Sequence, residues 1–216
     1  MTHNDIKYKD LFTFGWEKTK QHYWFLLGFF AINILLGILT SNAPVLNTVF
    51  SILATIAGIS VLLQIVHGHT PQYKDLLKPF KNYKITWHYV LGLLMMLAAL
   101  SVIAMLGMLL LLPESFALAS IGFIALLLPA VYATIRLQFF RYFIVEDENM
   151  GPIHAFKKSI SITRGKFWQL LGFICLLVLF NLVGLMLLFV GLLITVPVTM
   201  IAYTELYKKL SASHHA

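Results

Sequence analysis

The feature that most constrains this chain is an apolar run from Phe167 to Thr204 that contains no charged side chain. A straight helix of about 38 residues would be about 57 Å long, nearly twice the ~30 Å hydrocarbon core of a membrane. The apolar residues are continuous rather than alternating, which favours helices over the strands of a transmembrane barrel. We therefore predict two membrane-spanning helices in this run, with a turn near Phe189 to Gly191.

The composition of the whole chain also indicates that lipid, rather than water, surrounds most of it. Hydrophobic residues make up 59% of the 216 residues and charged residues 12%, and the mean hydropathy is +0.83. Soluble domains carry roughly 25% charged residues, because a surface that faces water needs them. About half that supply leaves most of the molecular surface apolar, which lipid tolerates and water does not. The one cysteine, Cys175, lies inside an apolar run and can form no internal disulfide.

Four further apolar runs precede this one, and short polar turns separate them in pairs. We predict spans at Trp24–Thr40, Val45–Val66, Trp87–Leu112 and Phe116–Phe143. The turns within the two pairs are Ser41–Pro44 and Pro113–Ser115. The predicted fold class is therefore all-α integral membrane, with six transmembrane helices arranged as three hairpins.

The positions of lysine and arginine predict the orientation of these helices. Basic residues lie before the first helix, between the second and third, around the end of the fourth and before the fifth, and after the sixth. The turns after the first, third and fifth helices contain none, and Glu114 is the only charged residue in them. By the positive-inside rule, we expect a multi-pass protein of the cytoplasmic (inner) membrane with both termini in the cytoplasm.

The entries to the odd-numbered helices resemble one another. Trp24, Trp87 and Trp168 are each followed, within one turn, by a Leu-Gly pair. This pattern predicts an internal repeat in a single membrane domain of residues 1–216, with copies at 8–67, 73–144 and 152–210.

An amphipathic segment precedes each odd-numbered helix. Before the first helix, one face consists of Tyr8, Leu11, Phe12, Gly15, Trp16 and Thr19, and the other of Lys9, Thr13, Glu17, Lys18 and Lys20. Before the third, the two faces are Leu76, Phe80, Tyr83 and Trp87 against Lys78, Lys81 and Lys84. Before the fifth, they are Phe156, Ile160, Thr163 and Phe167 against Lys157, Lys158, Ser161 and Arg164.

Aromatic and aliphatic residues opposite basic residues are typical of interfacial helices that lie on a membrane surface. We therefore expect three cytoplasmic interfacial segments, with the lipid bilayer and its anionic headgroups as partners. The basic residues on these segments account for the net charge of +7, so no nucleic acid is needed as a partner to explain it. The alternative interpretation is that the segments are ordinary solvated loops.

One motif in the last third of the chain is similar to a known family. Ala155, Ser159 and the stretch Thr163–Trp168 lead into an apolar hairpin that closes with Tyr203, Leu206 and Tyr207. This pattern resembles the membrane domain of bacterial glycerophosphoryl diester phosphodiesterases and its uncharacterised stand-alone multi-pass relatives. The resemblance implies a six-helix architecture in a bacterial inner membrane. It carries over no catalytic residue, because the soluble barrel that performs the phosphodiesterase chemistry has no room in this chain.

Polar residues near the ends of the apolar runs are the candidate binding residues, and they are Arg136, Gln138, Arg141, Lys166, Trp168 and Thr199. Arg136 lies about 30 Å along its helix from Phe116, so we expect it to snorkel at the cytoplasmic boundary. An ion pair with the acidic run Glu146–Glu148 and a contact with a lipid phosphate are the alternatives. Thr195, Thr199, Tyr203 and Tyr207 follow at four-residue spacing, which favours helix packing over a polar path.

No grouping of residues indicates catalysis or a cofactor. A nucleophile with a base, a glycine-rich phosphate loop and a set of metal ligands are all missing from the sequence patterns. We therefore predict a non-enzymatic membrane protein that interacts with lipid or organises a partner, either a second copy or another membrane protein. The alternative function is a small transporter or lipid-translocating protein for an anionic or amphiphilic substrate.

Overall fold

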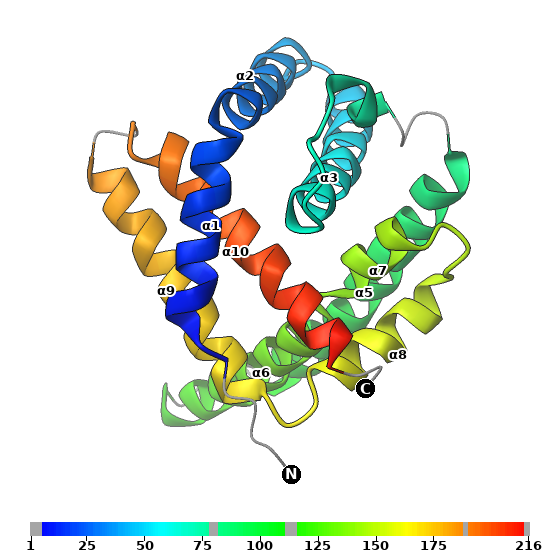
Figure 1. Ribbon diagram of the computed structural model, residues 1–216. Coiled ribbons are helices and arrows are strands. Elements are labelled where there is room, and N and C mark those ends of the chain that lie inside the picture. Colours follow the sequence, from blue (N-terminus) through cyan, green and yellow to red (C-terminus); the bar gives the residue numbers. More distant parts are fainter. Residues whose placement is uncertain (1–5, 78–81, 111–115, 188–189, 214–216) are drawn as a thin grey trace. The chain divides into compact units, whose positions relative to one another are not determined.

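A computed structural model describes residues 6–77, 82–110, 116–187 and 190–213, and these residues contain helices and no strand (Figure 1). The chain forms two compact units, one of Met1–Thr86 with Trp168–Ala216 and one of Trp87–Phe167. The first unit contains α1 (Tyr8–Gln21), α2 (Tyr23–Leu39), α3 (Pro44–Val66), the short 3-10 helix η1 (Tyr73–Leu77), α9 (Phe167–Met186) apart from its first residue, and α10 (Leu192–Ala212). The second contains α5 (Tyr83–Leu110) from Trp87 on, α6 (Phe116–Leu137), α7 (Phe140–Glu146), α8 (Pro152–Ile162) and Phe167.

Several of these helices can cross a membrane. Among the described residues, α3, α9 and the Tyr83–Leu106 part of α5 are long and apolar enough, and the count rises to four if α1 and α2 form one span with a bend of 84°. The prediction of a helical membrane protein is confirmed at this level. The ends of the predicted spans agree closely with the helices: α2 begins one residue before Trp24, and α3 begins one residue before Val45.

Large side chains on these helices are exposed, as expected for surfaces that face lipid. On α5, Leu94, Leu97 and Val102 each expose more than half of their surface. The tryptophans at the entries to α2, α5 and α9 are exposed as well, at 80% for Trp24, 60% for Trp87 and 78% for Trp168. Tryptophan favours the boundary between the hydrocarbon and the headgroups, so these positions fit span ends.

In the first unit, α1 packs against protein along its apolar face. Gly15 allows the close approach to α10, because a Cβ there would lie 2.6 Å from the carbonyl oxygen of Val198. On the side toward α9, the Tyr8 hydroxyl donates a hydrogen bond to the Gln169 carbonyl at 2.8 Å, and the Phe12 ring contacts Phe173. Much of the predicted apolar face of this segment is therefore covered by α9 and α10, whereas Trp16 on the same face is 41% exposed.

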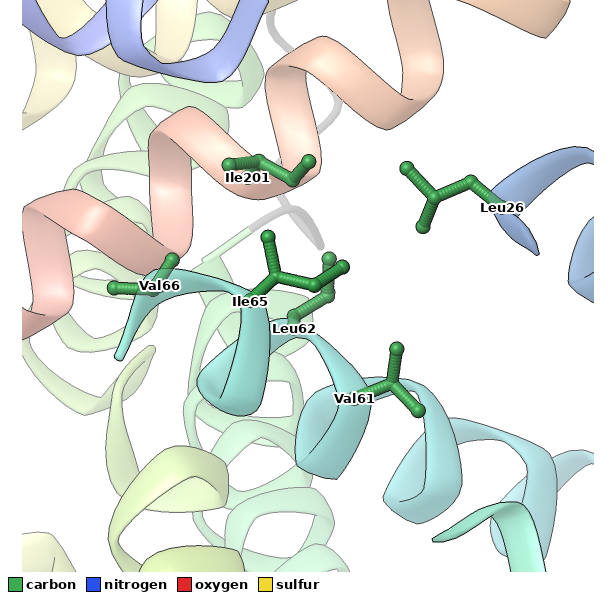
Figure 2. Close-up of a cluster of buried hydrophobic side chains, with 6 residues drawn as sticks. All are labelled: Leu26, Val61, Leu62, Ile65, Val66 and Ile201. Carbon is green, nitrogen blue, oxygen red and sulfur yellow. The ribbon is translucent and has the colours of Figure 1, made fainter. Parts of the chain in front are cut away.

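The core of the first unit lies where α2, α3 and α10 meet. Figure 2 shows the side chains that form it, which are Leu26, Val61, Leu62, Ile65, Val66 and Ile201. Each exposes 8% of its surface or less. The helix α3 ends directly after this cluster, where Gly68 adopts a φ of 84° and the His69 amide donates to the Gln64 carbonyl. This is a glycine-based helix terminus, which satisfies carbonyls that the helix leaves free.

The chain turns between α9 and α10. The helix α9 ends at Met186 and α10 begins at Leu192 after Gly191. The predicted turn at Phe189 to Gly191 agrees with these ends, although Phe189 lies outside the described residues. Close to the turn, Gly184 is in tight contact with Thr195 and Gly191, where a side chain on Gly184 would have no room.

In the second unit, the predicted fourth span does not form one helix. The prediction of a continuous span from Phe116 to Phe143 is wrong at its end, because α6 stops at Leu137 and α7 starts at Phe140. Gly92 of α5 packs directly on α7, since a Cβ there would lie 2.7 Å from the Phe140 ring. Of the predicted amphipathic segment before α5, Tyr83 and Trp87 are exposed, and Lys78, Phe80 and Lys81 lie outside the described residues. The turn at Pro113–Ser115 lies outside the described residues too.

Candidate lipid-binding site

The break between α6 and α7 is held by two hydroxyl groups of α8. The Ser159 hydroxyl donates to the Arg136 carbonyl at 2.8 Å and accepts from the Phe139 amide at 3.2 Å. One turn later, the Thr163 hydroxyl lies 3.4 Å from the same carbonyl. Ser159 and Thr163 are completely buried, as is Ala155. The small and hydroxylated stripe of α8 therefore satisfies backbone groups that the helix break leaves free.

Arg136 lies on an aromatic platform at the end of α6. Its guanidinium carbon is 5.7 Å from the centre of the Tyr132 ring, one turn earlier in the same helix. The Tyr132 ring in turn packs on Phe167, the first residue of α9, with ring centres 5.4 Å apart. Tyr132 is 52% exposed and Arg136 is partly exposed. A guanidinium at this distance from an aromatic ring gains cation–π attraction.

The guanidinium of Arg136 has no other partner among the described residues: its side chain forms no ion pair and no hydrogen bond there. The structure shows no ion pair between Arg136 and Glu146–Glu148 among the described residues. Snorkelling and contact with a phosphate stay predictions.

Arg141 has a different role from Arg136. Its guanidinium forms a side-chain hydrogen bond with Tyr89 of α5, which is 2% exposed, and lies 5.8 Å from the centre of the Phe140 ring. The first contact joins α7 to α5, and the second lies within α7. Arg141 therefore links α7 to α5 in the second unit.

The other predicted site residues fall into two groups. Gln138 is half-buried in the break between α6 and α7, and Lys166 precedes Phe167 of the aromatic platform. Trp168 follows on α9 and is exposed. The structure thus places both Arg136 and Phe167, the residue after Lys166, against the Tyr132 ring. Thr199 lies elsewhere, on α10, where its hydroxyl accepts a hydrogen bond from Asn181 at 3.1 Å and donates to the Val196 carbonyl.

The exposed face of α8 carries alternating apolar and basic residues. Ile153, Lys157 and Ile160 follow one another at spacings of four and three, so they share one side of the helix, and Arg164 lies in the turn directly after it. Ile153 is 54% and Ile160 is 40% exposed, and both basic residues are exposed. Neither Lys157 nor Arg164 forms an ion pair with any described residue, and the sequence contains no acidic residue between Glu148 and Glu205. We call Ile153, Lys157, Ile160 and Arg164 the α8 face.

Glu205 is a buried carboxylate that the sequence analysis did not single out. It is 8% exposed, and its Oε2 atom has no hydrogen-bond partner among the described residues. Its Oε1 atom lies 3.8 Å from the Lys209 ammonium, and the neighbouring Lys208 ammonium donates to the Val66 carbonyl at the end of α3. Glu205 lies past the apolar run that ends at Thr204. Burial raises the pKa of its carboxyl group, and the nearby Lys208, Lys209 and His67 lower that pKa by less.

Two signals in the sequence could have identified these missed residues. Tyr132 stands four residues before Arg136, a spacing that places both on one side of a helix. Glu205 is the only acidic residue after Glu148 and stands four residues before Lys209. The contact of Tyr132 with Phe167 joins residues 35 positions apart (167 minus 132), and no local pattern reports it. Within the described part of the chain, no group of three or more histidine, cysteine or acidic residues has the geometry to hold a metal ion.

Comparison with known proteins gives one match. The family described as "Domain of unknown function (DUF7847)" matches residues 83–213, from the start of α5 through α10. This is more than half of the chain, so the protein belongs to this family. No curated protein and no solved structure matches. The resemblance to the phosphodiesterase membrane domain therefore stays a prediction.

Proposed function

We propose that this member of the DUF7847 family is a non-enzymatic, six-span protein of the cytoplasmic membrane that binds anionic lipid through the α8 face. The six spans lie in α2, α3, α5, α6, α9 and α10, with the last one ending at Thr204 before Glu205, and both termini are in the cytoplasm. The observation that carries the proposal is the α8 face itself, where unpaired cations alternate with exposed isoleucines. Such a surface gains both from insertion of apolar side chains and from attraction to anionic headgroups.

Contacts between helix ends support the orientation. The Tyr132–Phe167 contact brings the end of α6 to the start of α9. In the first unit, the hydrogen bond from Lys208 to Val66 brings the end of α10 to the end of α3. In each pair, the two ends belong to the same side of the membrane in the proposed topology. A topology with α3 and α10 ending on opposite sides would be incompatible with the second contact.

Thermal stability of the full chain in lipid nanodiscs tests the proposal. We expect added phosphatidylglycerol to raise the melting temperature above its value in phosphatidylcholine, because a ligand that binds the folded state stabilises it. Replacing both cations of the α8 face, Lys157→Gln with Arg164→Gln, should remove more than half of this increase. Each cation near an anionic surface contributes about 1 kcal/mol. Added salt should weaken the effect of phosphatidylglycerol.

A matched variant with the same change in charge provides the control. Lys7→Gln with Lys9→Gln removes two exposed cations at the start of α1, where the neighbouring apolar face is covered by α9 and α10. This variant should keep most of the stabilisation by phosphatidylglycerol. An equal loss in both variants, or no loss in the α8 variant, would remove the basis for assigning lipid binding to the α8 face.

A further inference from the structure

We propose that Arg136, on the platform of Tyr132 and Phe167, forms a discrete binding site for the phosphate group of a phospholipid headgroup. The inference rests on the proposed membrane location of the chain but concerns a different surface from the α8 face. The α8 face responds to net negative charge, whereas this site recognises the phosphate oxygens themselves. Phospholipids with and without net charge should therefore both bind it.

The backbone of Arg136 is held in place by hydroxyl groups. The Arg136 carbonyl accepts the Ser159 hydrogen bond at 2.8 Å and lies 3.4 Å from the Thr163 hydroxyl. Both hydroxyl-bearing residues are completely buried. The start of the arginine side chain is therefore held by the interior of the second unit. A fixed starting point reduces the conformational entropy that binding would otherwise cost.

The guanidinium of Arg136 lies against an aromatic ring. Its central carbon lies over the Tyr132 ring, 5.7 Å from the ring centre, and the Phe167 ring packs against Tyr132. The N–H groups along the edge of the guanidinium have no partner among the described residues. Arginine presents these N–H groups as a planar fork that matches two oxygens of a phosphate, which a lysine ammonium does not.

Arg136 lies at the depth expected for the boundary between the hydrocarbon core and the headgroups. Arg136 is 20 residues beyond Phe116, so about 30 Å of helix separates the two, which is the thickness of the hydrocarbon core. The platform joins the end of α6 to the first residue of α9, next to Lys166. The phosphate of a lipid headgroup lies at this boundary.

Titration of the full chain in maltoside detergent, which contains no phosphate, tests this site. Native mass spectrometry would count bound molecules of phosphatidylcholine, which is uncharged overall but has a phosphate, and of digalactosyldiacylglycerol, which has none. We expect the chain to retain phosphatidylcholine and not the glycolipid. Arg136→Gln should weaken the binding of phosphatidylcholine about tenfold, since a hydrogen bond between charged groups is lost.

Graded variants separate this recognition from a loss of folding. Arg136→Lys keeps the charge but not the planar fork, so we expect a loss of binding between those of Gln and wild type. Tyr132→Leu removes the ring and should weaken binding several-fold, whereas Tyr132→Phe should leave binding unchanged. Equal binding of phosphatidylcholine by wild type and Arg136→Gln would overturn the proposal. Equal binding by the Lys and wild-type forms would overturn the role of the fork.

Two further experiments show whether the bound phosphate belongs to a lipid, and whether the Arg136 site and the α8 face act independently. Inorganic phosphate at millimolar concentration should not displace the bound phospholipid; displacement would show a site for free phosphate and overturn the lipid assignment. The double variant of Lys157 and Arg164 should bind phosphatidylcholine normally. If it also keeps its response to phosphatidylglycerol, the proposed function of the α8 face fails while the Arg136 site stands.

Discussion

The helices α1 and α8 are both short and amphipathic, but they bury different kinds of side chain. On α1, the buried positions are Leu11, Gly15 and Thr19, and the helix crosses α10 at the glycine. On α8, the buried positions are Ala155, Ser159 and Ile162, and the hydroxyl groups bond to the break between α6 and α7. The larger side chains of α8, Ile153 and Ile160, stay exposed next to its cations.

The difference shows that an amphipathic pattern does not say what covers its apolar face. The apolar side of α1 is covered by two helices of the same unit. On α8, small residues make the contact with protein. The two isoleucines stay exposed and can contact lipid. An exposed apolar face with unpaired cations fits a membrane surface, and a covered face does not.

The largest expected effect is at the crossing of α1 and α10. In the variant Gly15→Val, the new side chain would meet the Val198 carbonyl oxygen and the Ala202 methyl group. We expect a loss of about 3 kcal/mol in stability or a failure to fold, as for severe overpacking. Thermal unfolding in detergent measures the loss. The control is Gly37→Val on α2, where a Cβ meets nothing within 4 Å; if the two variants are equally stable, α1 is not docked as described.

A smaller effect is expected where α8 docks. Ser159→Ala leaves the Phe139 amide and the Arg136 carbonyl without their hydroxyl partner in a buried place, which costs about 1–3 kcal/mol. The matched change is Ser101→Ala, because the exposed Ser101 hydroxyl bonds only to the Ala98 carbonyl of its own helix. Urea or thermal unfolding should show a clear loss for the first and almost none for the second. A loss below about 0.5 kcal/mol at Ser159 would contradict its role at the helix break.

The smallest effect concerns the end of α10, where the first unit buries a carboxylate. Burial raises the pKa of Glu205 above its ordinary value of 4.5. The protonated form is therefore favoured in the folded state, and this contribution to stability is complete below pH 4.5 and is lost as the pH rises through the folded pKa. Glu205→Gln should melt about 2–4 °C higher than wild type at pH 8, for roughly 1 kcal/mol.

Melting curves between pH 4 and pH 8 check the sign of this effect. The advantage of the Glu205→Gln variant should shrink as the pH falls toward 4.5, because wild type then becomes protonated as well. Glu17→Gln on the exposed side of α1 is the control and should show no such trend. An advantage of the variant that grows toward low pH would contradict the inferred direction of the pKa shift.

The ends of several apolar helices could be predicted from the sequence, whereas most of the candidate site could not. The thickness of the membrane core sets the length of an apolar run, so Trp24–Thr40 and α2 differ by one residue at each end. The end of α6 at Leu137 has no such local cause, since neither glycine nor proline stands there. Ser159, which satisfies the break, is 20 residues away from Phe139.

Contacts between distant helices also decided which arginine is free. Arg136 and Arg141 are equally conspicuous in the sequence, because both stand at the end of an apolar run. Tyr89, more than 50 positions earlier, bonds Arg141 and leaves Arg136 as the arginine with an unoccupied edge. Patterns along the chain report solvent and periodicity, but pairing between helices depends on packing that local patterns do not contain.

Labelling of single cysteines in intact cells tests the central claim, that lipid surrounds the middle of this chain and that its cations lie on one side. In a Cys175→Ser background, we would compare Asn42→Cys in the turn between α2 and α3, Lys157→Cys on α8 and Lys209→Cys on α10. A maleimide that cannot cross the membrane should label the first from outside, and the other two only after the cells are opened. Labelling of positions 157 and 209 from opposite sides, or of 42 and 157 from the same side, would contradict the account.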